Sequence, residues 1–197
     1  MRKEMNEQLL KASNSGDINT VIRLLGCGAD LETTDNEFGH TPLLNASFMD
    51  RTDIVKLLLD RGANIDVKNK YGCTPLTLAS GRGHLNTVGL LLSRGADVDV
   101  ISFYAGNTAL LLSSLNGYVE IVELLLHHCT NINVTNKDGR TCFDNTRLLV
   151  WCKEDIQELI INKQPHNIKF FDDNIGILPR LKEKHKEIIG LVEMGLF

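Results

Sequence analysis

Asn69-Lys70-Tyr71-Gly72-Cys73-Thr74-Pro75-Leu76 is the stretch that decides the fold of this chain, because versions of it return at a fixed interval. An earlier copy is Asn36-Glu37-Phe38-Gly39-His40-Thr41-Pro42-Leu43, and the later ones are Gly106-Asn107-Thr108-Ala109-Leu110 and the weaker Asn136-Lys137-Asp138-Gly139-Arg140-Thr141. The glycines at positions 39, 72, 106 and 139 are 33, 34 and 33 residues apart. A fixed period in this range is typical of a solenoid, in which similar units stack on one another.

The unit that begins at position 69 can be interpreted residue by residue. Gly72 permits the positive φ of a tight turn, Thr74 is suited to cap a helix, and Pro75 is suited to its first position. A second helix is expected from near His84 to Gly95, where glycine favours a left-handed helix end. Two such short helices cannot bury their own apolar faces, so the units must stack. The sequence therefore predicts an all-α repeat solenoid.

The order and spacing of four short motifs within this unit resemble those of the ankyrin repeat. The motifs that carry the resemblance are Thr74-Pro75-Leu76, Gly83-His84, Leu90-Leu91-Leu92 and Gly95-Ala96-Asp97-Val98, and it extends over roughly residues 5 to 163. The resemblance implies antiparallel helix pairs joined by β-hairpin loops that project at near right angles. It also implies that protein partners lie against the concave side, which the hairpin tips and the first helix of each pair form.

Two departures from the family pattern lead to further expectations. The family places a histidine after Thr-Pro-Leu, where its ring braces the turn, but this chain has Leu44, Thr77 and Leu111 there. We therefore expect looser turns. One extra residue near Asp35 and another near Ser102 predict that those two hairpins are longer than the others.

The ends of the chain depart from the repeat pattern. We interpret residues 1–163 as an ankyrin-repeat domain of about five units with degenerate caps. Residues 164–197 are interpreted as a linker and an amphipathic C-terminal helix with an apolar stripe, namely Leu178, Leu181, His185, Ile188 and Val192. This helix either packs back onto the last repeat or docks a second partner. In the second case the chain is a two-ended adaptor that recruits machinery such as a ubiquitin ligase.

The function that the resemblance implies is a protein–protein interaction module, an adaptor or scaffold. Phe38, Tyr71 and Tyr104 are spaced by 33 and 33 residues and fall at predicted hairpin tips. Aromatic side chains on loops are common anchors of protein interfaces. Such rings can instead fold onto the neighbouring hairpin and brace it. For Phe103 the sequence favours neither partner contact nor this packing. The predicted partner-binding residues are Phe38, His40, Phe48, Met49, Tyr71, Arg82, Phe103, Tyr104, Asn107 and Arg140.

An enzyme is the competing class of function, and the sequence does not favour it. No glycine-rich phosphate loop, zinc-type cluster or nucleophile motif is present in the sequence. His127 and His128 are neighbours on a predicted helix and point about 100° apart, so they are poorly placed to chelate one ion. We expect no catalytic residues, no metal and no cofactor.

Composition narrows the class of partner. The net charge of -4 and pI near 5.9 give no basic footprint for nucleic acid, and no apolar run is long enough to span a membrane. The five cysteines have no metal or redox spacing, which favours reduced thiols. We expect a monomer with a protein partner, in the cytoplasm or also in the nucleus.

Overall fold

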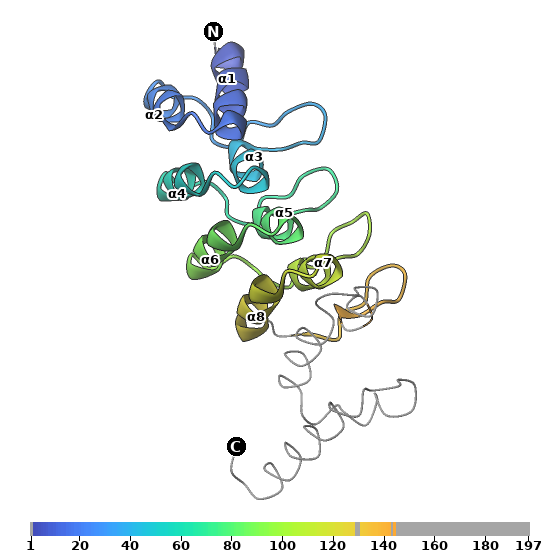
Figure 1. The fold of residues 1–197 in the computed structure, drawn as a ribbon. Coiled ribbons are helices and arrows are strands. Elements are labelled where there is room, and N and C mark those ends of the chain that lie inside the picture. Colours follow the sequence, from blue (N-terminus) through green and yellow to red (C-terminus); the bar gives the residue numbers. More distant parts are fainter. Residues whose placement is uncertain (1, 129–130, 143, 145–197) are drawn as a thin grey trace, which may run out of the picture.

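The computed structural model describes residues 2–128, 131–142 and 144, and this part of the chain is a stack of helix pairs (Figure 1). The first helices of the pairs, α1, α3, α5 and α7, form one layer, and the second helices form the other. Together with the loop that precedes each pair, they make four successive units. The helices are α1 (Arg2–Ser15), α2 (Ile18–Gly26), α3 (Pro42–Phe48), α4 (Thr52–Asp60), α5 (Pro75–Arg82), α6 (Leu85–Ser93), α7 (Ala109–Asn116) and α8 (Val119–His128).

The predicted capping residues lie at the ends of the helices. Thr41, Thr74 and Thr108 are the N-caps of α3, α5 and α7, and each hydroxyl accepts the backbone N–H three residues later at 3.3 Å. α5 and α7 end at glycines 83 and 117, both in the left-handed conformation. These caps confine the first helices to seven or eight residues in α3, α5 and α7.

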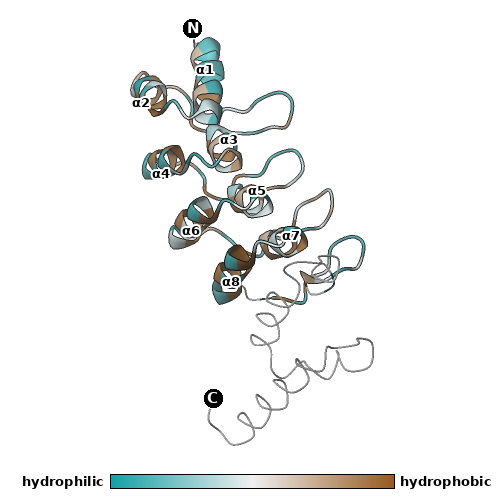
Figure 2. Ribbon diagram, viewed as in Figure 1, coloured by the Kyte–Doolittle hydropathy of each residue, from teal (hydrophilic) through white to brown (hydrophobic). Residues whose placement is uncertain are grey.

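The hydrophobic core runs through the stack because the same helix positions are apolar in successive units. The largest side chains that are fully buried include Leu43, Leu58, Leu76, Leu91 and Leu125. Figure 2 shows hydrophobic residues in the helices and more hydrophilic residues along the loops. Each unit therefore covers the apolar face of the next, as the 33-residue period predicts.

Four hairpin loops project from the side of the first helices (Figure 1). The described residues include no β-strand. In three of the loops a glycine N–H, of Gly72, Gly106 or Gly139, donates to the carbonyl of the loop's first residue at 2.9–3.1 Å. The two ends of each loop are joined by one backbone bond rather than by a strand ladder. The N–H donors and carbonyl acceptors are Asp35 and His40 (3.0 Å), Asn69 and Cys73 (3.1 Å), Ser102 and Asn107 (3.0 Å), and Asn136 and Arg140 (2.9 Å). The first and third bonds close loops one residue longer than the other two, which confirms the predicted difference in length.

The expectation of loose turns is wrong for the turn that precedes α5. The backbone N–H of Thr74 donates to the Thr77 hydroxyl at 2.7 Å, and that hydroxyl donates to the Thr74 carbonyl at 2.9 Å. Asn69 Oδ1 accepts the N–H groups of Tyr71 and Cys73, each at 2.9 Å. Threonine and asparagine therefore brace this turn in place of the histidine of the family pattern.

The C-terminal predictions lie mostly outside the described residues. The last described hairpin is 136–140, and Cys142 after it is buried. The rest of the degenerate closing repeat, the linker and the C-terminal helix of 164–197 are not among the described residues. Within the part that the structure describes, no helix has the length and apolar character needed to cross a membrane.

Candidate functional site

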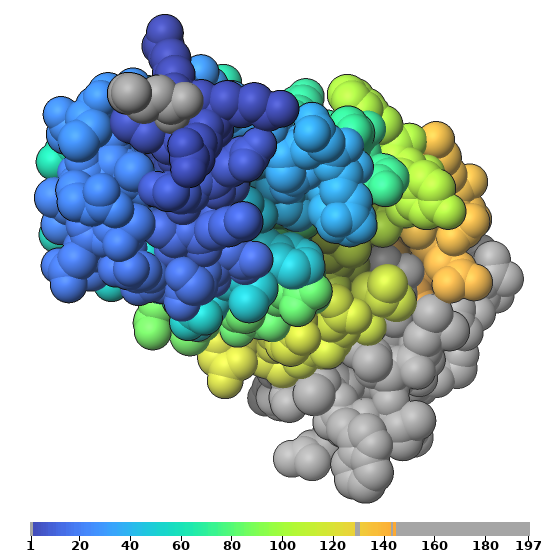
Figure 3. All heavy atoms as spheres, turned by 90° about the horizontal axis from the view of Figure 1, so that it is seen from above, coloured from blue at the N-terminus to red at the C-terminus, as the bar shows by residue number. Residues whose placement is uncertain are grey.

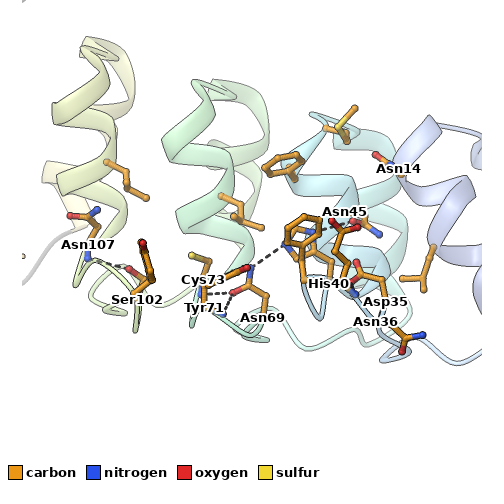
Figure 4. A pocket seen from close by; sticks show the side chains of 18 of the residues that line it. Asn14, Asp35, Asn36, His40, Asn45, Asn69, Tyr71, Cys73, Ser102 and Asn107 are labelled. Atoms are coloured by element: carbon orange, nitrogen blue, oxygen red, sulfur yellow. Dashed lines mark hydrogen bonds between the residues drawn. The ribbon is translucent and has the colours of Figure 1, made fainter.

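A groove of about 860 Å³ runs across all four described units, between the hairpin loops and the first helices (Figure 4). Its loop side comprises 35–40, 69–73 and 102–107, and its helix side comprises residues of α1, α3, α5 and α7. Seen along the stack, the hairpin ends of successive units are offset like steps (Figure 3). Aromatic rings and asparagine carboxamides dominate the lining, so the groove is suited to a partner with both apolar and hydrogen-bonding groups.

Three rings, one from each of three successive loops, form what we call the aromatic row: Phe38, Tyr71 and Tyr104. The ring centroids of Phe38 and Tyr71 are 6.5 Å apart, and those of Tyr71 and Tyr104 are 6.2 Å apart in an edge-to-face arrangement. The three residues are 40%, 43% and 78% exposed. The rings thus contact one another and still present apolar surface to solvent.

Backbone bonds between the loops hold the aromatic row in register. The N–H of Lys70 donates to the Phe38 carbonyl at 3.0 Å, and the N–H of Phe103 donates to the Tyr71 carbonyl at 2.7 Å. Each bond joins one loop to the next at the position of a row residue. The spacing of the row is therefore set by the stack itself.

His40 lines the groove but is largely buried, and its role as a contact residue stays a prediction. It is only 7% exposed, and both ring nitrogens are engaged: Nδ1 is 3.2 Å from Asn45 Oδ1, and Nε2 is 3.1 Å from Asn69 Nδ2. Because Asn69 Oδ1 already accepts two backbone N–H groups, its amide nitrogen faces His40. With this orientation Asn69 Nδ2 donates to Nε2, and the His40 ring joins two loops and α3.

Phe48 and Met49 line the helix side of the groove, and the exposed Arg82 lies against Phe48. The Phe48 ring is 5.8 Å from the His40 ring, and the Arg82 guanidinium carbon lies 3.6 Å from the Phe48 centroid. Met49 lies at the end of α3 and is partly exposed. A stacked guanidinium keeps its N–H donors in the ring-parallel plane, where a partner can reach them.

Three predicted contact residues are placed differently from the row. Phe103 is 61% exposed but packs beside Gly72, with the Lys68 ammonium 5.8 Å from its ring centroid, so it covers the neighbouring loop. Asn107 lines the groove, and its buried Oδ1 has no partner among the described residues. Arg140 is exposed and does not line the groove.

The groove also contains residues that the sequence analysis did not identify. Lys11 and Asn14 on α1 line it, as do Leu78 on α5 and Leu112 on α7. The first unit lacks the Thr-Pro motif that starts the later units, so α1 could not be aligned with their first helices from that motif. Aligning Ala12-Ser13 with Ala46-Ser47 could have found Lys11 and Asn14, because both pairs are buried at the same face of a first helix.

The described part of the groove carries no arrangement typical of catalysis. Burial raises the pKa of the Cys73 thiol, and a hydrogen bond involving Thr77 opposes this shift only in part. A thiol whose pKa is raised is a poor nucleophile at neutral pH. His127 and His128 are exposed at the end of α8, and the described residues hold no cluster of three metal-ligating side chains.

Comparison with known families agrees with this architecture. The family described as ankyrin repeats matches residues 9–102 with three copies, and a single ankyrin repeat matches residues 105–137. This chain belongs to the ankyrin-repeat family. The resemblance in sequence is thereby confirmed, together with the all-α stack of helix pairs.

Two relatives show how far the similarity to other ankyrin-repeat proteins extends. Ankyrin repeat, SAM and basic leucine zipper domain-containing protein 1 of Mustela putorius furo is 42% identical over 62 residues, 32% of this chain and 13% of the relative. Human 2-5A-dependent ribonuclease is 46% identical over 61 residues, 31% of this chain and 8% of that protein. The similarity thus spans about a third of this chain and a small part of each relative.

Proposed function

We propose that this chain is an adaptor or scaffold that holds one protein partner along the groove. Ankyrin repeats are generally protein–protein interaction modules. The observation that carries the proposal is the aromatic row, where three rings from consecutive loops contact one another and remain exposed. Exposed tyrosine and phenylalanine side chains on a rigid support are typical anchors of protein interfaces, because they bury much area with little loss of side-chain freedom.

The predicted residues divide into contact and positioning roles within this proposal. Phe38, Tyr71 and Tyr104 supply the anchors, and Met49 and Arg82 supply contacts from the helix side. His40 lines the groove and fixes the relative position of two loops through Asn45 and Asn69. The proposed interface therefore depends on a buried polar network as well as on its exposed rings.

The family also bears on the competing class of function. Ankyrin repeat domains are generally non-catalytic, and the ribonuclease relative matches only over a partial, repeat-containing region. Recruitment of a second partner by residues 164–197 stays a prediction, since those residues lie outside the described part of the chain.

The double variant Tyr71→Ala/Tyr104→Ala tests the proposed groove. The full chain is immobilised, partners are captured from an extract and identified, and one identified partner is titrated against native and variant protein. Loss of two of the three anchors should weaken its binding by at least about thirtyfold, since the loss of even one hot-spot aromatic residue costs about 2 kcal/mol or more. Thermal unfolding should change little because both rings are exposed.

A matched control removes similar side chains from the second helices. Ile22 on α2 and Leu85 on α6 are 44% and 41% exposed, comparable with Tyr71. Ile22→Ala/Leu85→Ala should leave partner binding unchanged. Equal binding by native protein and the tyrosine double variant, or a loss confined to the control variant, would move the interface away from the groove.

A further inference from the structure

The spacing of the aromatic row indicates the conformation of the segment that it can bind. Its ring centroids are 6.5 and 6.2 Å apart. In an extended β-strand, side chains on the same face recur every second residue, at about 6.4–6.8 Å. A helix repeats its contacts once per turn, every 5.4 Å. The row therefore matches an extended segment better than a helix.

The two sides of the groove differ in a way that suits the two faces of such a segment. The loop side presents the aromatic row, whereas Phe48 lines the helix side and carries the Arg82 guanidinium stacked on its ring. Successive side chains of an extended chain point in opposite directions. Residues at i, i+2 and i+4 can then contact the row while an intervening residue points to the helix side.

Charge identifies the intervening residue. The Arg82 guanidinium is stacked on Phe48 and is not within ion-pair distance of any carboxylate in the described residues. The carboxylate of Asp35, which lines the loop side of the groove, is already engaged, because its Oδ1 accepts the backbone N–H groups of Glu37, Phe38 and Gly39. A guanidinium without an ion-pair partner favours a carboxylate, because two of its N–H groups can each donate a hydrogen bond to one carboxylate oxygen.

We infer that the groove binds an extended segment of a protein partner with apolar side chains at every second residue and an intervening Asp or Glu that pairs with Arg82. This inference rests on the proposed function and adds the conformation and charge of the bound segment. The aromatic row buries the apolar side chains, and Arg82 sets the register, because only one alignment brings the carboxylate to the guanidinium.

A selection from a displayed library of random 12-residue peptides against the full chain tests the inference. Enriched peptides should share apolar residues at positions i, i+2 and i+4 with an Asp or Glu between them. The strongest peptide and its matched acid-to-amide version are then titrated by fluorescence anisotropy against native protein and two variants. Arg82→Met keeps an apolar contact with Phe48, and Lys56→Met removes an exposed charge from α4 on the other layer.

Arg82→Met should weaken binding of the acidic peptide by at least about tenfold and leave the amide version unchanged, because a charge-assisted hydrogen bond contributes at least that factor. Lys56→Met should affect neither peptide. The inference is overturned if no peptide is enriched, if apolar residues recur at spacings of three and four, or if the acid-to-amide change weakens binding equally in native protein and Arg82→Met.

The failure of this inference can be told apart from the failure of the proposed function. Peptides that bind Tyr71→Ala/Tyr104→Ala as tightly as native protein would show that the groove is not the binding surface. Peptides or partners that lose binding in that double variant but have helical spacing, or are insensitive to Arg82, would leave the groove in place and remove only the extended acidic segment.

Discussion

Two neighbouring junctions of the stack are built from different chemistry. Between the second and third units, which contain α3–α4 and α5–α6, polar side chains cross the boundary: His40 contacts Asn69, and Asp50 accepts a 2.8 Å hydrogen bond from Thr87. His84 also lies 3.1 Å through Nε2 from the Phe48 carbonyl. We call this boundary the polar junction.

Between the third and fourth units, rings of one unit pack on glycines of the other. A Cβ on Gly72 would lie 2.7 Å from the Phe103 ring, and a Cβ on Gly83 would lie 2.7 Å from the Tyr118 ring. The direct hydrogen bonds across this boundary include Phe103 N–H to the Tyr71 carbonyl and Asn116 Nδ2 to the Gly81 carbonyl, at 2.7 and 2.8 Å. We call it the ring junction.

The difference shows that one helix-pair geometry can be kept by two means. The polar junction fixes register through directional bonds, and it leaves buried donors and acceptors unpaired if one member is lost. The ring junction fixes register through shape, and it tolerates loss of atoms better than addition of them. The type of substitution that destabilises most should therefore differ between the two junctions.

The largest effect is expected at the ring junction from Gly72→Ala. Gly72 has φ +77°, which costs an alanine about 1–2 kcal/mol, and the new Cβ would also meet the Phe103 backbone nitrogen at 2.8 Å. Since the backbone must move, we expect a total loss of about 3–4 kcal/mol in the free energy of unfolding. Urea denaturation followed by far-UV circular dichroism measures it.

Gly95→Ala is the matched control for this substitution. Gly95 has φ +83°, but a Cβ there meets no atom within 4 Å. It should lose only the conformational part, about 1–2 kcal/mol. Equal losses in the two variants would mean that close packing at Gly72 contributes nothing to the ring junction.

The second largest effect is expected at the polar junction from His40→Ala. The change leaves Asn45 Oδ1 and Asn69 Nδ2 without their present partner and opens a cavity among the loops, at a cost of about 2–3 kcal/mol. Cys73 occupies the corresponding position of the next loop, so Cys73→Ala should cost less than about 1 kcal/mol. A smaller loss for His40→Ala than for Cys73→Ala would contradict the assignment of the polar junction.

Local signals in the sequence were sufficient for the stack but not for its junctions. Thr74, Pro75 and Gly83 act within one unit, so their roles could be predicted from their order and spacing. His40 and Asn69 are 29 residues apart, and their bond depends on how two loops are stacked. At the surface of a loop, histidine is a plausible contact residue, and only the three-dimensional structure shows that this one is buried.

The groove was predicted in the same partial way. The 33-residue spacing correctly placed Phe38, Tyr71 and Tyr104 in consecutive loops and brought them into one row. The different position of Phe103 could not be predicted, because it depends on the side of the longer third loop from which the residue projects. The role of Thr77 was also missed, since its bonds replace those of a different residue type.

The smallest effect is expected from converting one contact of the polar junction to the apolar type found elsewhere in the stack. Asp50 has φ +55° at a position where the third and fourth units have glycines 83 and 117, and buried Thr87 occupies the position of Ile54 and Ile121. Asp50→Gly and Thr87→Ile should each cost about 1 kcal/mol, because each removes the 2.8 Å bond between the two side chains.

The double variant Asp50→Gly/Thr87→Ile should be within about 0.5 kcal/mol of the native free energy of unfolding. Glycine relieves the left-handed strain and isoleucine buries more apolar surface, and these gains offset the loss of both partners of the half-buried Thr52 hydroxyl, Thr87 Oγ1 at 2.7 Å and Asp50 Oδ1 at 3.5 Å. The expected coupling between the two sites is therefore about 2 kcal/mol, within the range for residues in contact. Additive losses in the urea titrations would instead show that Asp50 and Thr87 stabilise the polar junction independently, and that polar and ring contacts are not interchangeable at this position.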